Sequence, residues 1–169
     1  TNTAGHEEDF PVPGNRFGVG LSWDAPPGRP RVDLDLQCVI VNNAGAITDC
    51  AYYNNLKAAR SVTHSGDELT GQKSGVDEQV WVTTARVPSE VSLLVFVLAA
   101  YKGGTLRDVA NGKFLIFEES ERNVVAEMGI ECSDASVDVI AAMFRGPQGW
   151  SLRILEEPAQ EGQHFMDIL

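Results

Sequence analysis

Acidic residues gather at the start of one predicted β-strand, where their spacing could create a cation site. Asp33 and Asp35 alternate with Leu34 and Leu36, so in a strand the two carboxylates share one face and the two leucines share the other. Asp24 ends the preceding predicted strand, across a proline-rich loop. Two like charges on one strand face repel each other unless water or a cation screens them. Taken alone, the pattern fits either a solvated strand end or a cation site.

A second acidic stretch lies further along the chain, in a loop rich in glycine and serine. Asp67 and Glu68 follow Gly66, and Asp77 and Glu78 end the loop just before the next predicted strand. Calcium (Ca²⁺) takes about six to eight oxygen ligands from carboxylates and carbonyls in a flexible geometry. Glycine lets a loop turn its carbonyls toward an ion. These residues therefore predict a calcium site built from separate loops that converge at one end of the fold.

A single-loop EF-hand does not fit this stretch. Asp67 and Glu78 stand at the first and last positions of such a loop, but Gln72 occupies the position where the loop requires glycine. His64, at the start of the stretch, is better explained as a packed or capping side chain than as a ligand. Imidazole suits zinc rather than calcium, and no second histidine is near in the sequence.

The elements that would position these residues are short strands. Segments with alternating or continuous apolar residues recur with turn residues every ten or so positions, which is typical of an all-β fold. We expect a two-sheet β-sandwich of mainly antiparallel strands with short helical turns. The predicted strands are 17–23, 33–43, 47–53, 79–83, 91–101, 114–117, 124–128, 137–145 and 150–155.

Three segments are less regular. Residues 54–76 are predicted to be a long loop, and 105–111 a short helical turn. Residues 133–144 also fit one face of a helix, so a strand and a helix both stay open there. Turns are predicted at 42–45 and 145–149, from their asparagine, glycine and proline residues.

The length of 169 residues suits one domain. We expect an extended lead-in over residues 1–16, because it is rich in glycine, proline and acidic residues, and one domain over residues 17–157. The expected tail, residues 158–169, carries four large apolar side chains, which are Phe165, Met166, Ile168 and Leu169.

Composition limits the classes of partner. The net charge of −11 disfavours binding to nucleic acid or to anionic lipid. The longest apolar stretch, 91–101, is far shorter than the ~20 residues of a membrane-spanning helix. Cys38, Cys50 and Cys132 cannot all pair and form no metal-binding Cys-x-x-Cys motif. A reducing, cytoplasmic location is expected.

In the order and spacing of these motifs, the sequence resembles the TerD family of tellurium-resistance and stress-response proteins. The resemblance covers roughly residues 17–155, nearly the whole chain. The segments that carry it are Gly20-Leu21-Ser22-Trp23-Asp24, Asp33-Leu34-Asp35-Leu36, His64-Ser65-Gly66-Asp67 with Thr70-Gly71, Asp77-Glu78, Val87-Pro88 and Gly149-Trp150.

The resemblance implies a calcium-binding β-sandwich with no established catalytic activity. The metal-site residues that it implies are Asp24, Asp33, Asp35, Asp67, Asp77 and Glu78, with backbone carbonyls of Leu34, Gly66 and Gly71. Residues 72–76 depart from the acidic, glycine-rich stretch of the family. Lys73 adds a positive charge and Val76 stands where a carboxylate is expected, which weakens the case for the second of two implied calcium sites.

The function expected from these features is that of a non-enzymatic calcium-binding domain in stress response or tellurium resistance. It would act as an interaction or scaffold module, with a protein partner or by self-association through the apolar tail residues. The alternative is a metal-dependent hydrolase that uses the same carboxylates. The sequence contains no Gly-x-Ser-x-Gly, no His-Glu-x-x-His and no phosphate-binding glycine loop, which disfavours the hydrolase.

Overall fold

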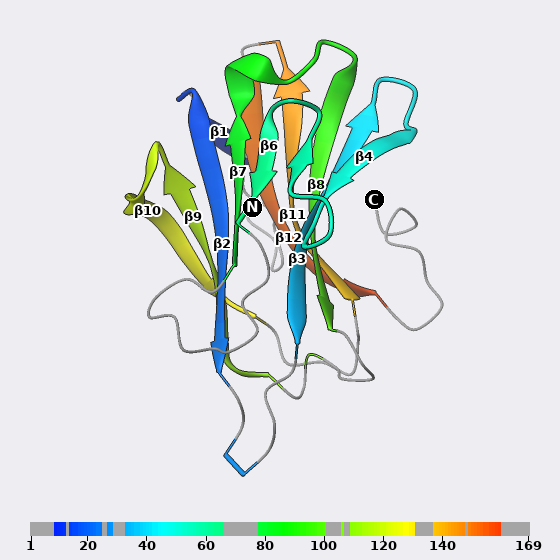
Figure 1. Cartoon of the computed structure of the whole chain (residues 1–169). Coiled ribbons are helices and arrows are strands. Elements are labelled where there is room, and N and C mark those ends of the chain that lie inside the picture. The colour runs from blue at the N-terminus through cyan, green and yellow to red at the C-terminus, as the bar shows by residue number, and fades with distance from the viewer. Residues whose placement is uncertain are drawn as a thin grey trace, which may run out of the picture.

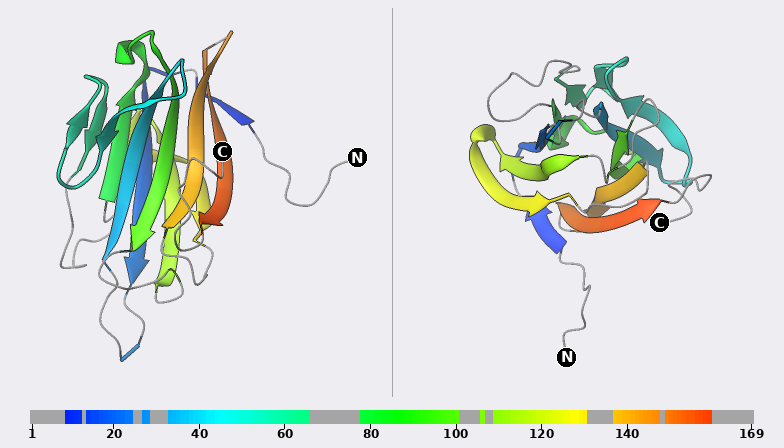
Figure 2. Two further views of the ribbon diagram at one scale, coloured as in Figure 1. Left: turned by 90° about the vertical axis from the view of Figure 1, so that its right-hand side faces the viewer. Right: turned by 90° about the horizontal axis from the view of Figure 1, so that it is seen from below.

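The protein is a β-sandwich of two six-stranded antiparallel sheets, called here sheet A and sheet B (Figure 1). The computed structural model describes residues 9–12, 14–24, 27–28, 33–65, 78–100, 106, 109–130, 137–147 and 149–159. Seen from below, the two sheets form two layers with the core between them (Figure 2). The expected all-β sandwich is confirmed.

Sheet A has the strand order β1-β12-β11-β8-β3-β4. Its strands are β1 (Asp9–Val12), β3 (Leu34–Asn42), β4 (Ile47–Ala51), β8 (Val91–Ala100), β11 (Val137–Gly146) and β12 (Gly149–Ala159).

Sheet B has the order β10-β9-β2-β7-β6-β5. Its strands are β2 (Arg16–Asp24), β5 (Lys57–Ala58), β6 (Val62–His64), β7 (Glu78–Thr83), β9 (Ala110–Glu118) and β10 (Ser120–Gly129). A 3-10 turn, Thr84–Arg86, follows β7. Within the described part of the chain, no helix is long or apolar enough to cross a lipid bilayer.

The alternation of side chains along the strands explains the core. In β3 the leucines at 34 and 36, followed by Cys38 and Ile40, point between the sheets and are fully buried. Val19 and Leu21 of β2, with Val80 of β7, meet them from sheet B. Each of these side chains removes apolar surface from water, which is the main driving force for packing the two sheets.

Two turns form where the sequence predicts them. The Asn42 side chain accepts hydrogen bonds from the backbone N–H groups of Ala44 and Ala46, both at 2.9 Å, and closes the turn between β3 and β4. Gly45 follows with a φ of +81°, which glycine adopts without steric cost. Gly146 pairs with Gly149, so β11 and β12 are joined by a two-residue connection.

The structure differs from the sequence-based expectation in two segments and refines it in two others. Residues 9–12 of the expected lead-in form β1, which pairs with β12. The expected loop 54–76 contains the short strands β5 and β6. Residues 137–146 are a strand, which settles the ambiguous segment within 133–144. β9 begins at Ala110, so the last two residues of the expected helical turn 105–111 are strand, whereas Leu106 within it has 3-10 conformation.

Candidate functional site

The two sheets meet through three polar side chains at the end of the sandwich where β3 and β7 begin. Asp35 is the second residue of β3 in sheet A, whereas Glu78 is the first residue of β7 in sheet B. His64 is the last residue of β6, which lies beside β7 in sheet B. We call these three residues the buried acidic group.

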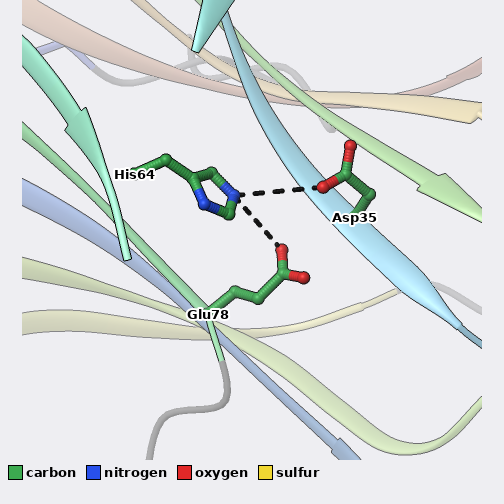
Figure 3. A group of neighbouring side chains, drawn as sticks. All are labelled: Asp35, His64 and Glu78. Carbon is green, nitrogen blue, oxygen red and sulfur yellow. Dashed lines mark ion pairs between the residues drawn. The ribbon is translucent and has the colours of Figure 1, made fainter. Parts of the chain in front are cut away.

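The buried acidic group is compact and shielded from water. One ligand atom from each residue lies within 4.8 Å of the others. His64 Nε2 lies 3.5 Å from Glu78 Oε2 and 3.9 Å from Asp35 Oδ1, as the dashed lines in Figure 3 show. The three residues are at most 2% exposed. Any charges on them therefore interact in a medium of low dielectric constant, where the Coulomb energy between two charges is larger than at the surface.

Strand register explains why His64 and Glu78 lie together. His64 pairs with Val80 of β7, two residues beyond Glu78. Residues two apart on a strand share a face, so the imidazole and the carboxylate are diagonal neighbours on the inner face of sheet B. The Ser65 N–H donates to the Gln79 carbonyl at 2.8 Å, and the Gln79 N–H donates to Ser65 Oγ at 2.8 Å. These two bonds fix the end of β6 against β7.

The free edge of β3 explains why the side chains of sheet B reach across to sheet A. The β3–β4 ladder ends at the pair Cys38 and Ala51, so β4 does not reach Leu36. The Leu36 N–H donates instead to Glu78 Oε2 at 2.8 Å, and its carbonyl lies 2.9 Å from His64 Nε2. Buried backbone groups need partners. Two side chains of sheet B therefore take the place of the missing strand.

The contact with Leu36 determines the role of His64. A carbonyl oxygen only accepts hydrogen bonds, so Nε2 carries the proton that joins them. A protonated nitrogen has no lone pair for a metal ion. In this geometry His64 is a structural donor between the sheets, which agrees with the packed side chain favoured by the sequence.

Carboxylate oxygens remain as the metal-binding atoms of the group. The second oxygen of Glu78 points away from His64 in Figure 3. Asp35 Oδ2 accepts a hydrogen bond from Gln37 Nε2 at 2.8 Å, which orients the Asp35 carboxylate. Hard carboxylate oxygens brought from separate strands fit calcium or another hard cation, whereas the imidazole nitrogen does not contribute.

The structure brings together some of the site residues expected from the sequence. Asp35 and Glu78 meet, although they are far apart in the chain. Asp24 lies outside the group, is exposed and accepts a hydrogen bond from Asn111 Nδ2 at 3.1 Å. Asp33 is half-buried just before β3 and also lies outside the group, and the Leu34 side chain is in the core. The remaining expected residues, Gly66, Asp67, Gly71 and Asp77, are outside the described residues.

Sequence reasoning missed the contribution of the Leu36 backbone and of Gln37. Gln37 lies two residues after Asp35 on the same strand face, and this spacing could have indicated its hydrogen bond to Asp35. Nothing in the sequence indicates that β4 stops short of Leu36, because strand length depends on pairing in three dimensions.

A thiol lies close to the group but is not ionised at neutral pH. Burial raises the pKa of the Cys50 thiol to about 11, and the Asp35 and Asp49 carboxylates add to the effect. Burial, with a smaller effect from Cys50, also raises the pKa of Cys38 well above its usual value. Metal ligation and nucleophilic attack need the thiolate. Neither cysteine is therefore an activated nucleophile at neutral pH.

The fold and the site together define a class: an antiparallel β-sandwich whose sheets are joined by a buried pair of carboxylates. The family model of the TerD domain matches residues 13–166, which is most of the chain. The chain therefore belongs to the TerD family.

Curated relatives carry names linked to resistance and stress. General stress protein 16U of Bacillus subtilis is 37% identical over 156 residues, which cover 85% of this chain and 81% of that protein. Tellurium resistance protein TerD of Serratia marcescens is 30% identical over 147 residues, covering 80% and 76%. Tellurium resistance protein TerZ of the same organism is 27% identical over 152 residues, covering 83% and 79%.

Solved structures support the fold. The crystal structure of a homologue of the telluride resistance protein TerD from Streptomyces coelicolor superposes with a TM-score of 0.75. It is 20% identical in sequence, and the match covers 87% of this chain and 91% of that one. A likeness at this identity establishes the shared sandwich and nothing finer.

Proposed function

We propose that the chain is a calcium-binding module without catalytic activity, which serves stress response or tellurium resistance by binding a partner protein. The observation that carries this proposal is the meeting of Asp35 and Glu78, two buried carboxylates supplied by opposite sheets. A cation there would hold both sheets at once.

The charge of the buried acidic group supports a cation. Two ionised carboxylates carry two negative charges, and a protonated His64 supplies at most one positive charge. If both carboxylates are ionised, the group is negative in a region of low dielectric constant, where two like charges repel strongly unless a cation balances them. The net charge of −11 over the chain adds a field that attracts cations.

The proposed ligand set extends the two described carboxylates with residues of the neighbouring segments. Asp35 and Glu78 would supply carboxylate oxygens, while His64 keeps its hydrogen bond to Leu36. The further proposed ligands are Asp67 and Asp77, with carbonyls of Leu34, Gly66 and Gly71. Calcium accepts such a set because its coordination number and geometry are flexible, whereas magnesium requires a near-ideal octahedron.

Calcium titration tests the proposal. Calcium at millimolar concentration should raise the melting temperature and release or absorb heat in calorimetry, and magnesium at the same concentration should do neither to a comparable extent. Asp35→Asn should remove most of the calcium-induced shift. Glu127→Gln is the matched control, because Glu127 is an exposed carboxylate on β10, paired with Lys113. No heat and no thermal shift with calcium would contradict the proposal.

We propose that the chain is not a catalyst because His64, which is buried and hydrogen-bonded, is poorly placed to act as a base. A hydrolase would need a base or a metal ion with an open position for water. The imidazole of His64 is engaged with the Leu36 carbonyl and lies in a buried position, which disfavours it as a base. Asp35→Asn and Glu78→Gln should therefore leave hydrolysis of a panel of phosphate and carboxylic esters at the background rate of the wild type.

The proposed role in tellurium resistance or stress response is based on the names of the curated relatives. If calcium binding serves tellurium resistance, cells that depend on this chain should lose tellurite tolerance with Asp35→Asn and keep it with Glu127→Gln. Survival on tellurite, with matched protein levels by immunoblot, measures this. A cytoplasmic location is part of the proposal, and it is supported by Cys38 and Cys50, which form no disulfide.

A further inference from the structure

Sheet A carries a second cluster of buried apolar side chains on the face that does not meet sheet B. We call it the outer valine cluster; its members are Val39, Val41, Val95, Val97 and Val139. They come from three neighbouring strands, β3, β8 and β11. Cys50, Leu93, Val137 and Leu155 pack around them and are partly buried.

Strand alternation places this cluster on the outer face. In β3, Val39 and Val41 alternate with Cys38 and Ile40, which belong to the core between the sheets. In β8, Val95 and Val97 alternate with Leu94, Phe96 and Leu98, which also belong to that core. Sheet B packs against the inner face of sheet A and cannot cover the valines.

The low solvent exposure of these valines shows that other atoms cover the outer face of sheet A. They are between 0% and 4% exposed, as deeply buried as the core itself. Val124 and Val125, on the edge strand β10, are 44% and 52% exposed. Side chains that stand side by side on one sheet cannot shield one another from above, so another segment must lie over the cluster.

Chain geometry identifies the segment that can reach it. β12 ends at Ala159, which pairs with Val137 at the border of the cluster. Ten residues follow, and at about 3.3 Å per residue they can extend ~33 Å. Crossing from β12 over β11 and β8 to β3 takes only about 14 Å, since neighbouring strands lie ~4.8 Å apart.

Composition supports the same segment. Residues 165–169 contain Phe165, Met166, Ile168 and Leu169, which are four large apolar side chains in five positions. The other segments that connect or precede the described strands, such as 66–77 and 131–136, are rich in glycine, serine and acidic residues. None of them offers a comparable apolar run.

We propose that residues 165–169 dock on the outer valine cluster of the same molecule and form a third layer over sheet A. The segment buries its own apolar side chains and those of the valines together, so both surfaces leave water in one contact. The inference is independent of calcium binding, because no proposed calcium ligand belongs to the cluster.

Methyl NMR on the full-length wild type tests the contact directly. We expect nuclear Overhauser effects between the Phe165 ring and the methyl groups of the five valines. A sample that mixes differently labelled copies distinguishes contacts within one molecule from contacts between two. Absence of these effects would overturn the proposal, as would their appearance only between two copies.

A second variant measures the contribution to stability in the full chain. Replacing Phe165, Met166, Ile168 and Leu169 together by serine should lower the melting temperature by roughly 5 °C or more. The matched control is Val124→Ser with Val125→Ser, which removes two exposed apolar side chains of β10 and should change the melting temperature much less. Equal changes in the two variants would contradict the docking.

Discussion

At the scale of single residues, the contact between His64 and Leu36 decides which atoms remain for a cation. The imidazole donates to a backbone carbonyl at the free edge of β3, and Glu78 accepts from the N–H of the same residue. The sequence favours a packed His64 because imidazole suits calcium poorly. It cannot identify the partner, because Leu36 comes within reach only after the two sheets have packed.

We predict that His64→Ala lowers the free energy of unfolding by about 2–4 kcal/mol, because it leaves the buried Leu36 carbonyl without its donor and opens a cavity between the sheets. Urea denaturation measures the change. Thr63→Ala is the control, since Thr63 is exposed on the same strand, and it should cost less than about 0.5 kcal/mol. If His64→Ala left the free energy of unfolding unchanged, the bridging role of His64 would be contradicted.

The raised pKa of Cys50 gives a prediction on reactivity. A thiol with a pKa of about 11 stays protonated at pH 8, so alkylation of Cys50 should be roughly a hundredfold slower than that of an ordinary cysteine. Its rate should keep rising through pH 10 instead of levelling off near pH 9. Site-resolved mass spectrometry of iodoacetamide labelling measures this, and a plateau near pH 9 would contradict the environment described for the thiol.

At the scale of elements, the alternation of apolar and polar residues in the long strands could be recognised in the sequence. The strands of two or three residues could not. The long strands β2, β3 and β8 carry enough apolar positions to be predicted, whereas the pattern of β11 also fits a helix. β5 and β6 have two and three residues, and they depend on pairing with β7 rather than on their own pattern. β1 contains Pro11 and lies at a sheet edge, where proline is tolerated, so its sequence resembles a loop.

The middle of β2 offers a test of packing at this scale. A Cβ atom at Gly18 would lie 2.8 Å from the ring of Trp81, which is stacked on Phe117 and covered by the Arg16 guanidinium. Because Phe117 and Arg16 both contact the Trp81 ring and limit its movement, Gly18→Ala should lower the free energy of unfolding by about 1–3 kcal/mol. Gly129→Ala on β10 is the control, since a Cβ there meets nothing within 4 Å. Equal losses in urea denaturation would contradict a close approach specific to Gly18.

At the scale of the whole molecule, the proposed cation links the two sheets at one end of the sandwich. The sequence predicts that Asp35 and Glu78 converge, because both stand where strands begin, and they do so. It does not predict that Asp24 points to Asn111. That contact depends on how β2 and β9 twist past each other beyond the bulge between Ser22 and Asp24.

The most direct test of the calcium proposal is a crystal structure grown with calcium, in which anomalous scattering locates the ion. We predict an ion bound by carboxylate oxygens of Asp35 and Glu78 at about 2.3–2.6 Å, with His64 Nε2 still hydrogen-bonded to the Leu36 carbonyl. An ion bound elsewhere, or none beside these carboxylates at saturating calcium, would contradict it.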